Sequence, residues 1–167
     1  MRKEQYEVPN VEFVFREGGE FISRNTAELF NNKRVVVFSL PGAFTPTCSA
    51  YQLPGYEEKY DEFSNLGIDT IYCVSVNDGF VMNAWAKELG ILNVQFLADG
   101  NCEWTDAVGM AVDKLNLGFG CRSWRYAVVI NDNKFEQWFV EPGKQTDCPT
   151  DPYEASTPEA VLEYLSQ

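Results

Sequence analysis

Some segments of the chain alternate apolar and polar residues as strands do, and others repeat apolar residues at the spacing of a helix. Alternation in period 2, or a continuous apolar run, predicts a strand, whereas apolar residues repeated every three or four positions predict a helix. A strand at 11–15 is followed by a Gly18-Gly19 turn and a return strand through Phe21 and Ile22. The other predicted strands are 35–40, 68–76, 94–98, 125–130 and 135–140.

Helical patterns lie between these strands. After a loop at 41–48, Tyr56, Tyr60, Phe63 and Leu66 recur at helical spacing up to Gly67, and Pro54 is expected to start or kink this helix. The other predicted helices are a turn at 26–30 capped by Thr26, a helix capped by Asn77-Asp78 and ended by Gly90, a short helix at 101–110, and a last helix at 159–165 opened by Thr157-Pro158.

This order of elements predicts one α/β domain covering residues 1–167. Two strand–helix–strand crossovers imply parallel strands, and a late hairpin around residues 131–134 adds antiparallel ones. The result is a mixed central sheet flanked by helices, the layout of a thioredoxin-like fold with an N-terminal hairpin extension.

Charge and length narrow the possible partners. The 167 residues carry a formal net charge of -12, and no basic cluster is longer than Lys33-Arg34, so neither a nucleic acid nor an anionic membrane surface is expected as partner. No apolar run approaches a membrane span of about 20 residues. Residues 1–10 show no apolar core of a secretory signal, so a cytoplasmic location is expected.

Cysteine and histidine usage limits the chemistry. The chain has five cysteines, Cys48, Cys73, Cys102, Cys121 and Cys148, and no histidine. An odd number of thiols argues against a disulfide scaffold, and the lack of imidazole removes catalysis by histidine as a base. No Cys-x-x-Cys pair is present and no histidine could complete a zinc site, so no metal site is expected. No cofactor is expected either.

The loop at 41–48 places Cys48 where a buried strand passes into a helix. The positive end of the helix dipole and the unpaired backbone N–H groups there favour a thiolate. Thr45 lies three residues earlier and could orient a small polar substrate, while Pro41 and Pro46 stiffen and shield the loop. The alternative is an inert, buried cysteine in a proline-rich turn.

The motif P-x-x-x-T-x-x-C, from Pro41 to Cys48, resembles the active-site loop of the peroxiredoxins, and more narrowly of their type II (five-like) subfamily. The resemblance runs from about Pro9 to Leu165 and includes segments 53–55, 74–78, 97–99, 122–126 and 140–142. It implies the reduction of hydrogen peroxide and organic hydroperoxides.

The resemblance also implies a role for four residues. Cys48 matches the peroxidatic cysteine, and Thr45 matches the threonine that hydrogen-bonds the peroxide. Pro41 matches the proline that shapes the pocket, and Arg125 the arginine that stabilises the thiolate and the transition state. Without the resemblance, a surface salt bridge would be the favoured interpretation of Arg125. The chain departs from many relatives at Gln52, where they carry histidine.

The sulfenic acid left on Cys48 must then be reduced, because it otherwise oxidises further. Segment 151–159 resembles the end of the peroxiredoxin half in fused peroxiredoxin–glutaredoxin proteins, which implies glutathione and glutaredoxin as reductant. The alternative is an internal disulfide with Cys148, regenerated by thioredoxin. Cys73 is expected in the core and Cys102 at a helix cap, while Cys121 has no assigned role.

Two other functions use the same residues. A non-enzymatic redox sensor would oxidise Cys48 once and change partners, and the motif does not distinguish it from an enzyme. A thioredoxin-like disulfide reductase is disfavoured because Cys-x-x-Cys is missing. The resemblance further implies a homodimer.

Overall fold

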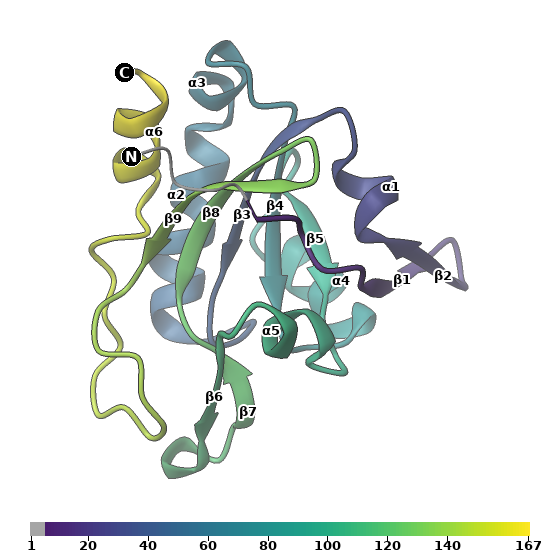
Figure 1. Cartoon of the computed structure of the whole chain (residues 1–167). Helices are drawn as coiled ribbons and strands as arrows, with labels where there is room; N and C mark the ends of the chain where they lie inside the picture. The colour runs from purple at the N-terminus through teal and green to yellow at the C-terminus, as the bar shows by residue number, and fades with distance from the viewer. Residues whose placement is uncertain (1–5) are drawn as a thin grey trace.

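A computed structural model describes residues 6–167, so part of the segment judged for a secretory signal lies outside the described residues. Five strands form the central sheet in the order β5-β4-β3-β8-β9 (Figure 1). They are β3 (Arg34–Ser39), β4 (Thr70–Ser75), β5 (Gln95–Ala98), β8 (Tyr126–Asn131) and β9 (Lys134–Val140). β3, β4 and β5 run parallel, whereas β8 is antiparallel to both of its neighbours, β3 and β9, which confirms the mixed sheet.

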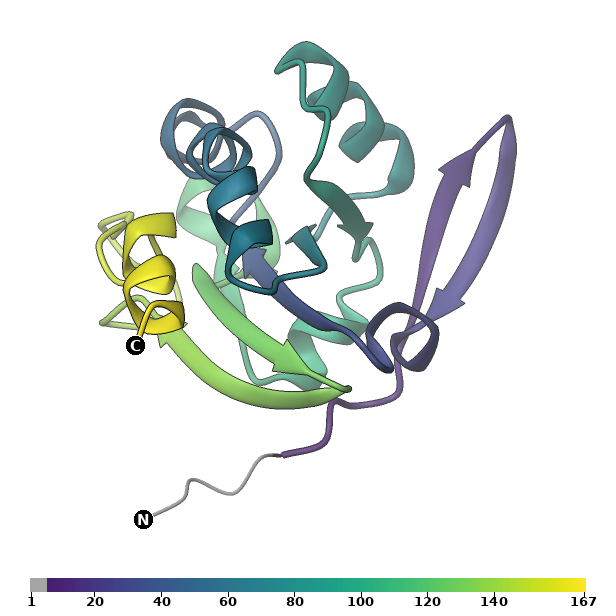
Figure 2. The same ribbon diagram turned by 90° about the horizontal axis from the view of Figure 1, so that it is seen from above.

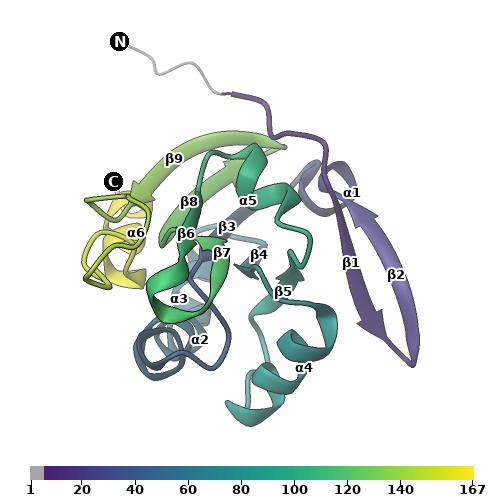
Figure 3. The same ribbon diagram turned by 90° about the horizontal axis from the view of Figure 1, so that it is seen from below.

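Both faces of this sheet are buried. Val35 and Val37 of β3 point into one hydrophobic cluster, and Val36 and Phe38 point into the other. The continuous apolar run of β3 is therefore explained by a strand covered on both sides. α1 (Thr26–Phe30) and α5 (Glu103–Ala107) cover the first face. α2 (Leu53–Glu58), α3 (Tyr60–Asn65), α4 (Gly79–Glu88) and α6 (Pro158–Leu165) cover the second (Figure 3).

The N-terminal extension is a separate two-stranded hairpin of β1 (Glu12–Glu17) and β2 (Glu20–Asn25). Its turn uses Gly18 and Gly19 at φ 57° and 80°, values that glycine adopts without steric cost. The hairpin projects to one side of the molecule beyond β5 (Figure 2). The predicted extension is thus present as an arm beside the main sheet.

The residues that cap the helices are those predicted from the sequence at α4 and α6, but the capping differs at α1 and α5. Asp78 and Thr157 cap α4 and α6 as predicted, with side chains that accept from Val81 N–H and Ala160 N–H. At α1 the cap is Asn25, because the Thr26 hydroxyl donates to the Pro9 carbonyl instead. At α5 the Cys102 side chain makes no capping bond; the Asp99 carboxylate accepts from the Trp104 and Thr105 N–H groups.

The segment between α5 and β8 contains a hairpin that sequence periodicity did not predict. β6 (Ala111–Lys114) pairs antiparallel with β7 (Gly120–Ser123), and a 3-10 turn at Leu115–Leu117 lies between them. The predicted helix at 101–110 is correspondingly shorter. The two strands read AVDK and GCRS, which hold too few apolar residues to form the apolar run or alternation that marks a strand. Among residues 6–167, no helix is long and apolar enough to cross a membrane.

Candidate active site

Cys48 lies at the carboxyl end of β3, beyond a loop that begins after Ser39. Its side chain is fully buried, at 0% exposure. The first bond of the following helix runs from Ser49 N–H to the Thr45 carbonyl. The Cys48 N–H therefore belongs to the first helical turn, whose N–H groups have no intrahelical acceptor and attract negative charge.

Cys48 also opens a π-helical turn, Cys48–Gln52, whose wider ring is closed by Leu53 N–H donating to the Cys48 carbonyl. Pro54 follows directly and lacks the N–H that would continue an α-helix. As expected, Pro54 lies at the start of a helix, because α2 begins at Leu53 directly after the π-helical turn; irregular helical backbone precedes it from Pro46. The wide turn accommodates the proline, and turns of this kind are frequent at functional sites.

The loop before Cys48 is held in an unusual backbone shape. Phe44 has φ 63°, a left-handed conformation that is costly for a large side chain. Arg122 of β7 donates from Nη1 to the Pro41 carbonyl at 3.1 Å. A Cβ at Gly42 would lie 2.5 Å from that Nη1, so a larger residue would require the Arg122 guanidinium to shift. Pro41 itself is buried and lines a cavity together with Thr45.

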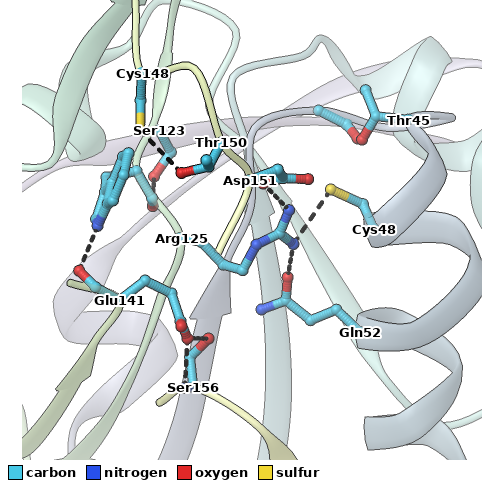
Figure 4. A network of polar contacts seen from close by, with 12 residues as sticks. Thr45, Cys48, Gln52, Ser123, Arg125, Glu141, Cys148, Thr150, Asp151 and Ser156 are labelled. Carbon is cyan, nitrogen blue, oxygen red and sulfur yellow. Dashed lines mark hydrogen bonds and ion pairs between the residues drawn. The ribbon is translucent and has the colours of Figure 1, made fainter. Parts of the chain in front are cut away.

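Arg125 is brought to the Cys48 sulfur although 77 residues separate them. Its Nη1 donates to Cys48 Sγ at 3.5 Å, and its Nη2 donates to Asp151 Oδ1 at 2.6 Å (Figure 4). The side chain is 1% exposed. Burial disfavours the charge of Arg125, but Cys48 and the Asp151 carboxylate outweigh it and raise the pKa of the guanidinium. Arg125 is therefore part of a buried site and not of a surface salt bridge.

Gln52 and Asp151 hold Arg125 in place, and sequence reasoning assigned a role to neither. The Gln52 Oε1 atom accepts from Arg125 Nη1, and the Gln52 side chain is fully buried. Gln52 lies four residues after Cys48, on the same helical turn, a spacing that could have signalled the contact. Asp151 is 26 residues from Arg125, and no local pattern marks it.

Glu141 fixes the segment that carries Asp151. Its buried carboxylate accepts from the backbone N–H groups of Glu154, Ala155 and Ser156 and from the Ser156 hydroxyl, at 2.6–3.0 Å (Figure 4). A carboxylate that accepts several backbone N–H groups makes strong, charge-assisted bonds. Glu141 thus acts on the site indirectly, by anchoring the loop opposite Cys48.

Thr45 lies beside Cys48, and the direction of its hydrogen bond is informative. Its hydroxyl donates to the Gly42 carbonyl at 2.7 Å. A hydroxyl has one hydrogen and two acceptor lone pairs, so Thr45 presents its acceptor side to anything that approaches the sulfur. This geometry suits Thr45 as an acceptor for a substrate O–H group and not as a donor to negative charge.

Cys148 lies across a cavity from the active-site loop. The cavity measures about 280 Å³ and is lined on one side by Pro41, Thr45 and Pro46, and on the other by Cys148 and Asp151. In Figure 4 the Thr150–Asp151 backbone lies between the two sulfurs. Burial raises the pKa of Cys148, but hydrogen bonds from the Thr150 N–H and hydroxyl and from Gln145 lower it below the ordinary value.

The remaining cysteines divide into two kinds. Cys73 on β4 is fully buried, and burial raises its pKa well above the ordinary value, which agrees with a core residue. Cys102 and Cys121, by contrast, lie side by side near the surface. Within the part of the chain that the structure describes, no group of three or more His, Cys, Asp or Glu residues could hold a metal ion.

Comparison with known proteins identifies relatives of this arrangement. The Redoxin family model matches residues 4–156. A peroxiredoxin of Sinorhizobium fredii is 58% identical over 142 residues, covering 85% of this chain and 76% of that protein. A hybrid peroxiredoxin of Haemophilus influenzae is 48% identical, and the match covers 95% of this chain but 64% of that protein.

Among solved structures, the Plasmodium falciparum antioxidant protein, a 1-Cys peroxiredoxin, superposes with a TM-score of 0.94 at 42% identity. The match covers 98% of each chain, so the thioredoxin-like fold extends over nearly the whole molecule.

Proposed function

The chain belongs to the redoxin family as a peroxiredoxin, a thiol-dependent peroxidase, and from this membership we propose that Cys48 is its peroxidatic cysteine. The observation that carries the proposal is a buried sulfur 3.5 Å from Arg125, whose guanidinium is held by Gln52 and Asp151. A fixed cation beside a thiol favours the thiolate, which is the nucleophile.

The reaction starts when the Cys48 thiolate attacks one oxygen of the peroxide. The S–O bond forms as the O–O bond breaks, and the second oxygen leaves as hydroxide or alkoxide and takes up a proton. Thr45 accepts a hydrogen bond from the peroxide O–H and orients it. Arg125 and the Cys48 N–H stabilise the charge that develops on the oxygens. Pro41 closes the pocket against water.

Substitution of Cys48 tests this assignment. Cys48→Ser should lose peroxidase turnover with hydrogen peroxide and any thiol reductant, since a serine hydroxyl is not ionised at neutral pH. Cys73→Ser is the matched control, because that thiol is buried and lies outside the proposed chemistry. Full turnover in Cys48→Ser would refute the proposal.

We also propose that the sulfenic acid on Cys48 is reduced from outside, by glutathione with glutaredoxin. The Cys148 sulfur contacts Gln145 and Thr150, and in the view of Figure 4 Thr150 and Asp151 lie between it and Cys48. The name of the Plasmodium relative, a 1-Cys peroxiredoxin, supports external reduction. The alternative is resolution by Cys148 with thioredoxin as reductant, favoured by the lowered pKa of the Cys148 thiol and by the shared cavity.

Mass spectrometry separates the two routes. Wild type and Cys148→Ser are treated with one equivalent of hydrogen peroxide in the presence of a sulfenic-acid trap. Equal trapping at Cys48 in both proteins favours external reduction. A Cys48–Cys148 bridge in the wild type, with trapping only in the variant, would show internal resolution instead. No modification of Cys48 in either protein would contradict its peroxidatic role.

We propose further that the chain forms a homodimer through the surface around the active-site loop and acts in the cytoplasm. Phe44, in the loop, is 53% exposed, and Leu117, at the rim of the 280 Å³ cavity, is 55% exposed. Exposed large apolar side chains of this kind are typical of an interaction surface.

A further inference from the structure

Two thiols outside the peroxidatic site lie in contact. The Sγ atoms of Cys102 and Cys121 are 3.1 Å apart, although the residues are 19 positions apart in sequence. Both cysteines are free. Neither contacts Cys48 or Arg125, and neither lines the cavity shared by Thr45 and Cys148. The proposed peroxidase chemistry therefore does not account for this pair.

Each sulfur is carried by a well-anchored backbone. Cys102 has φ 61°, and its N–H donates to the Asp99 carbonyl while its carbonyl accepts from Asp106 N–H. Cys121 lies in β7, in register with Asp113 of β6. A disulfide needs a sulfur separation of about 2.05 Å, so closing the bond requires a movement of roughly 1 Å. Side-chain rotation supplies such a movement without unfolding either element.

We propose that Cys102 and Cys121 form a second redox site, which hydrogen peroxide converts to an intramolecular disulfide. In the first step the Cys121 sulfur attacks a peroxide oxygen, which gives a sulfenic acid and releases the other oxygen as water. In the second step the Cys102 sulfur displaces the sulfenic hydroxyl, which leaves as water with the Cys102 proton. Two thiols and one peroxide thus give one disulfide and two waters.

The surroundings of the two cysteines indicate that Cys121 is the attacking thiol and Cys102 the resolving thiol. Cys121 is exposed and accessible to peroxide, whereas Cys102 is half-buried. Burial, the adjacent Cys121 thiol and the Asp99 and Asp106 carboxylates raise the pKa of Cys102 to about 12. Cys102 therefore stays a thiol while Cys121 reacts. Once Cys121 is a sulfenic acid, the Cys102 sulfur, 3.1 Å away in the reduced protein, is placed to act as the resolving thiol.

The proposed Cys102–Cys121 disulfide would lie near the Pro41–Cys48 loop but outside it. Cys121 precedes Arg122, whose guanidinium holds the Pro41 carbonyl at 3.1 Å. A disulfide would tie β7, and with it Arg122, to the loop that begins α5. Under oxidising conditions, the disulfide would therefore restrict the movement of Arg122 and of the Pro41 carbonyl to which it donates.

The test uses the full chain with Cys48→Ser, so that the peroxidatic thiol does not consume the oxidant. After treatment with excess hydrogen peroxide, free thiols are blocked under denaturing conditions and the protein is digested with trypsin. Cleavage after Lys87, Lys114 and Arg122 places Cys102 in peptide 88–114 and Cys121 in peptide 115–122. We expect a cross-link between these two peptides and the loss of two titratable thiols. The wild type, treated in the same way, should show the same cross-link.

Two further variants test the direction of the chemistry. In Cys102→Ser, Cys121 should be captured by a sulfenic-acid trap, because its partner is missing. In Cys121→Ser, Cys102 should remain an unmodified thiol. Serine is close to cysteine in size, so both variants retain the local packing.

The proposal fails if the thiol titre of Cys48→Ser does not change, or if the cross-link joins Cys121 to Cys148 or to a second molecule. Equal trapping of Cys102 and Cys121 in the single variants would overturn the assignment of Cys121 as the attacking thiol. Because Cys48 is absent from the main experiment, either result is independent of the proposed peroxidase mechanism.

Discussion

At the scale of single residues, the site depends on a hydroxyl and an amide that orient other groups. Thr45 has its hydrogen engaged by the Gly42 carbonyl, and Gln52 accepts from the guanidinium that contacts the sulfur. Neither side chain undergoes bond changes in the proposed reaction. Their substitution should therefore lower the rate while leaving Cys48 present.

Replacing Thr45 by valine keeps the shape of the side chain but removes the hydroxyl. We expect the second-order rate constant with hydrogen peroxide to fall roughly a hundredfold, comparable to the loss of one polar group that binds a transition state. Stopped-flow kinetics measures this change. Thr45→Ser is the control and should keep most of the rate, and a valine variant as fast as the serine variant would exclude the hydroxyl from the reaction.

Replacing Gln52 by leucine leaves Arg125 Nη1 without one of its buried acceptors. An unsatisfied buried donor costs about 1–3 kcal/mol, so the guanidinium should shift and the peroxide rate should fall by roughly tenfold or more. Because Gln52 is a positioning residue, the alkylation rate of Cys48 by iodoacetamide should fall as well. Gln52→His, which introduces the residue of many relatives, should retain activity. Unchanged alkylation in the leucine variant would contradict the positioning role.

At the scale of elements, a single carboxylate joins β3, β9 and α6. Glu136 of β9 accepts two hydrogen bonds from Arg34 of β3, at 3.1 and 2.6 Å, and one from the Tyr164 hydroxyl of α6 at 2.8 Å. Burial by itself would raise the pKa of Glu136, but Arg34 and Tyr164 outweigh it and lower the pKa below 4.5.

A lowered carboxyl pKa makes stability depend on pH in a definite direction. The unfolded chain binds the Glu136 proton more readily than the folded one, so the stabilisation is present above pH 4.5 and is lost as pH falls through the lower, folded pKa. Glu136→Gln should therefore be less stable than wild type by roughly 1 kcal/mol at neutral pH. The difference should shrink in acid. Urea unfolding at several pH values measures it, and a gap that widened in acid would contradict the assignment.

At the scale of the whole molecule, exposed apolar residues lie around the entrance to the active site and also elsewhere. If the surface around Phe44 and Leu117 forms the proposed homodimer interface, Phe44→Glu should dissociate the dimer, because a carboxylate would be buried without a partner. Analytical ultracentrifugation measures the change in mass. Leu92 is 88% exposed in the loop before β5, at the opposite end of the sheet, so Leu92→Glu is the matched control. Dissociation by Leu92→Glu alone would place the interface elsewhere.

The architecture combines a two-sided core with a site at one end of the sheet. The two hydrophobic clusters fix β3 between layers of helices, and this fixes where the Pro41–Cys48 loop leaves the sheet. β8 lies beside β3, with Tyr126 opposite Ser39 in register. Arg125, directly before β8, is therefore delivered to the same end of the sheet as Cys48.

Features that depend on neighbours in the chain were determined by the sequence itself. The continuous apolar run of β3 predicted a strand buried on both faces, and Asp78 and Thr157 marked the starts of α4 and α6. The motif from Pro41 to Cys48 marked the candidate catalytic loop. Each of these signals rests on bonds or packing within a few residues, where spacing and side-chain type suffice.

Features that depend on contacts across the molecule were decided only by the tertiary structure. Gln52 and Asp151 meet at Arg125 from 73 and 26 residues away, and Cys102 meets Cys121 only because the β6–β7 hairpin folds back towards α5. The hairpin itself escaped the sequence pattern because its strands, AVDK and GCRS, hold few apolar residues. Such contacts depend on how helices and strands pack in three dimensions, and local periodicity carries no information about which distant side chains that packing brings together.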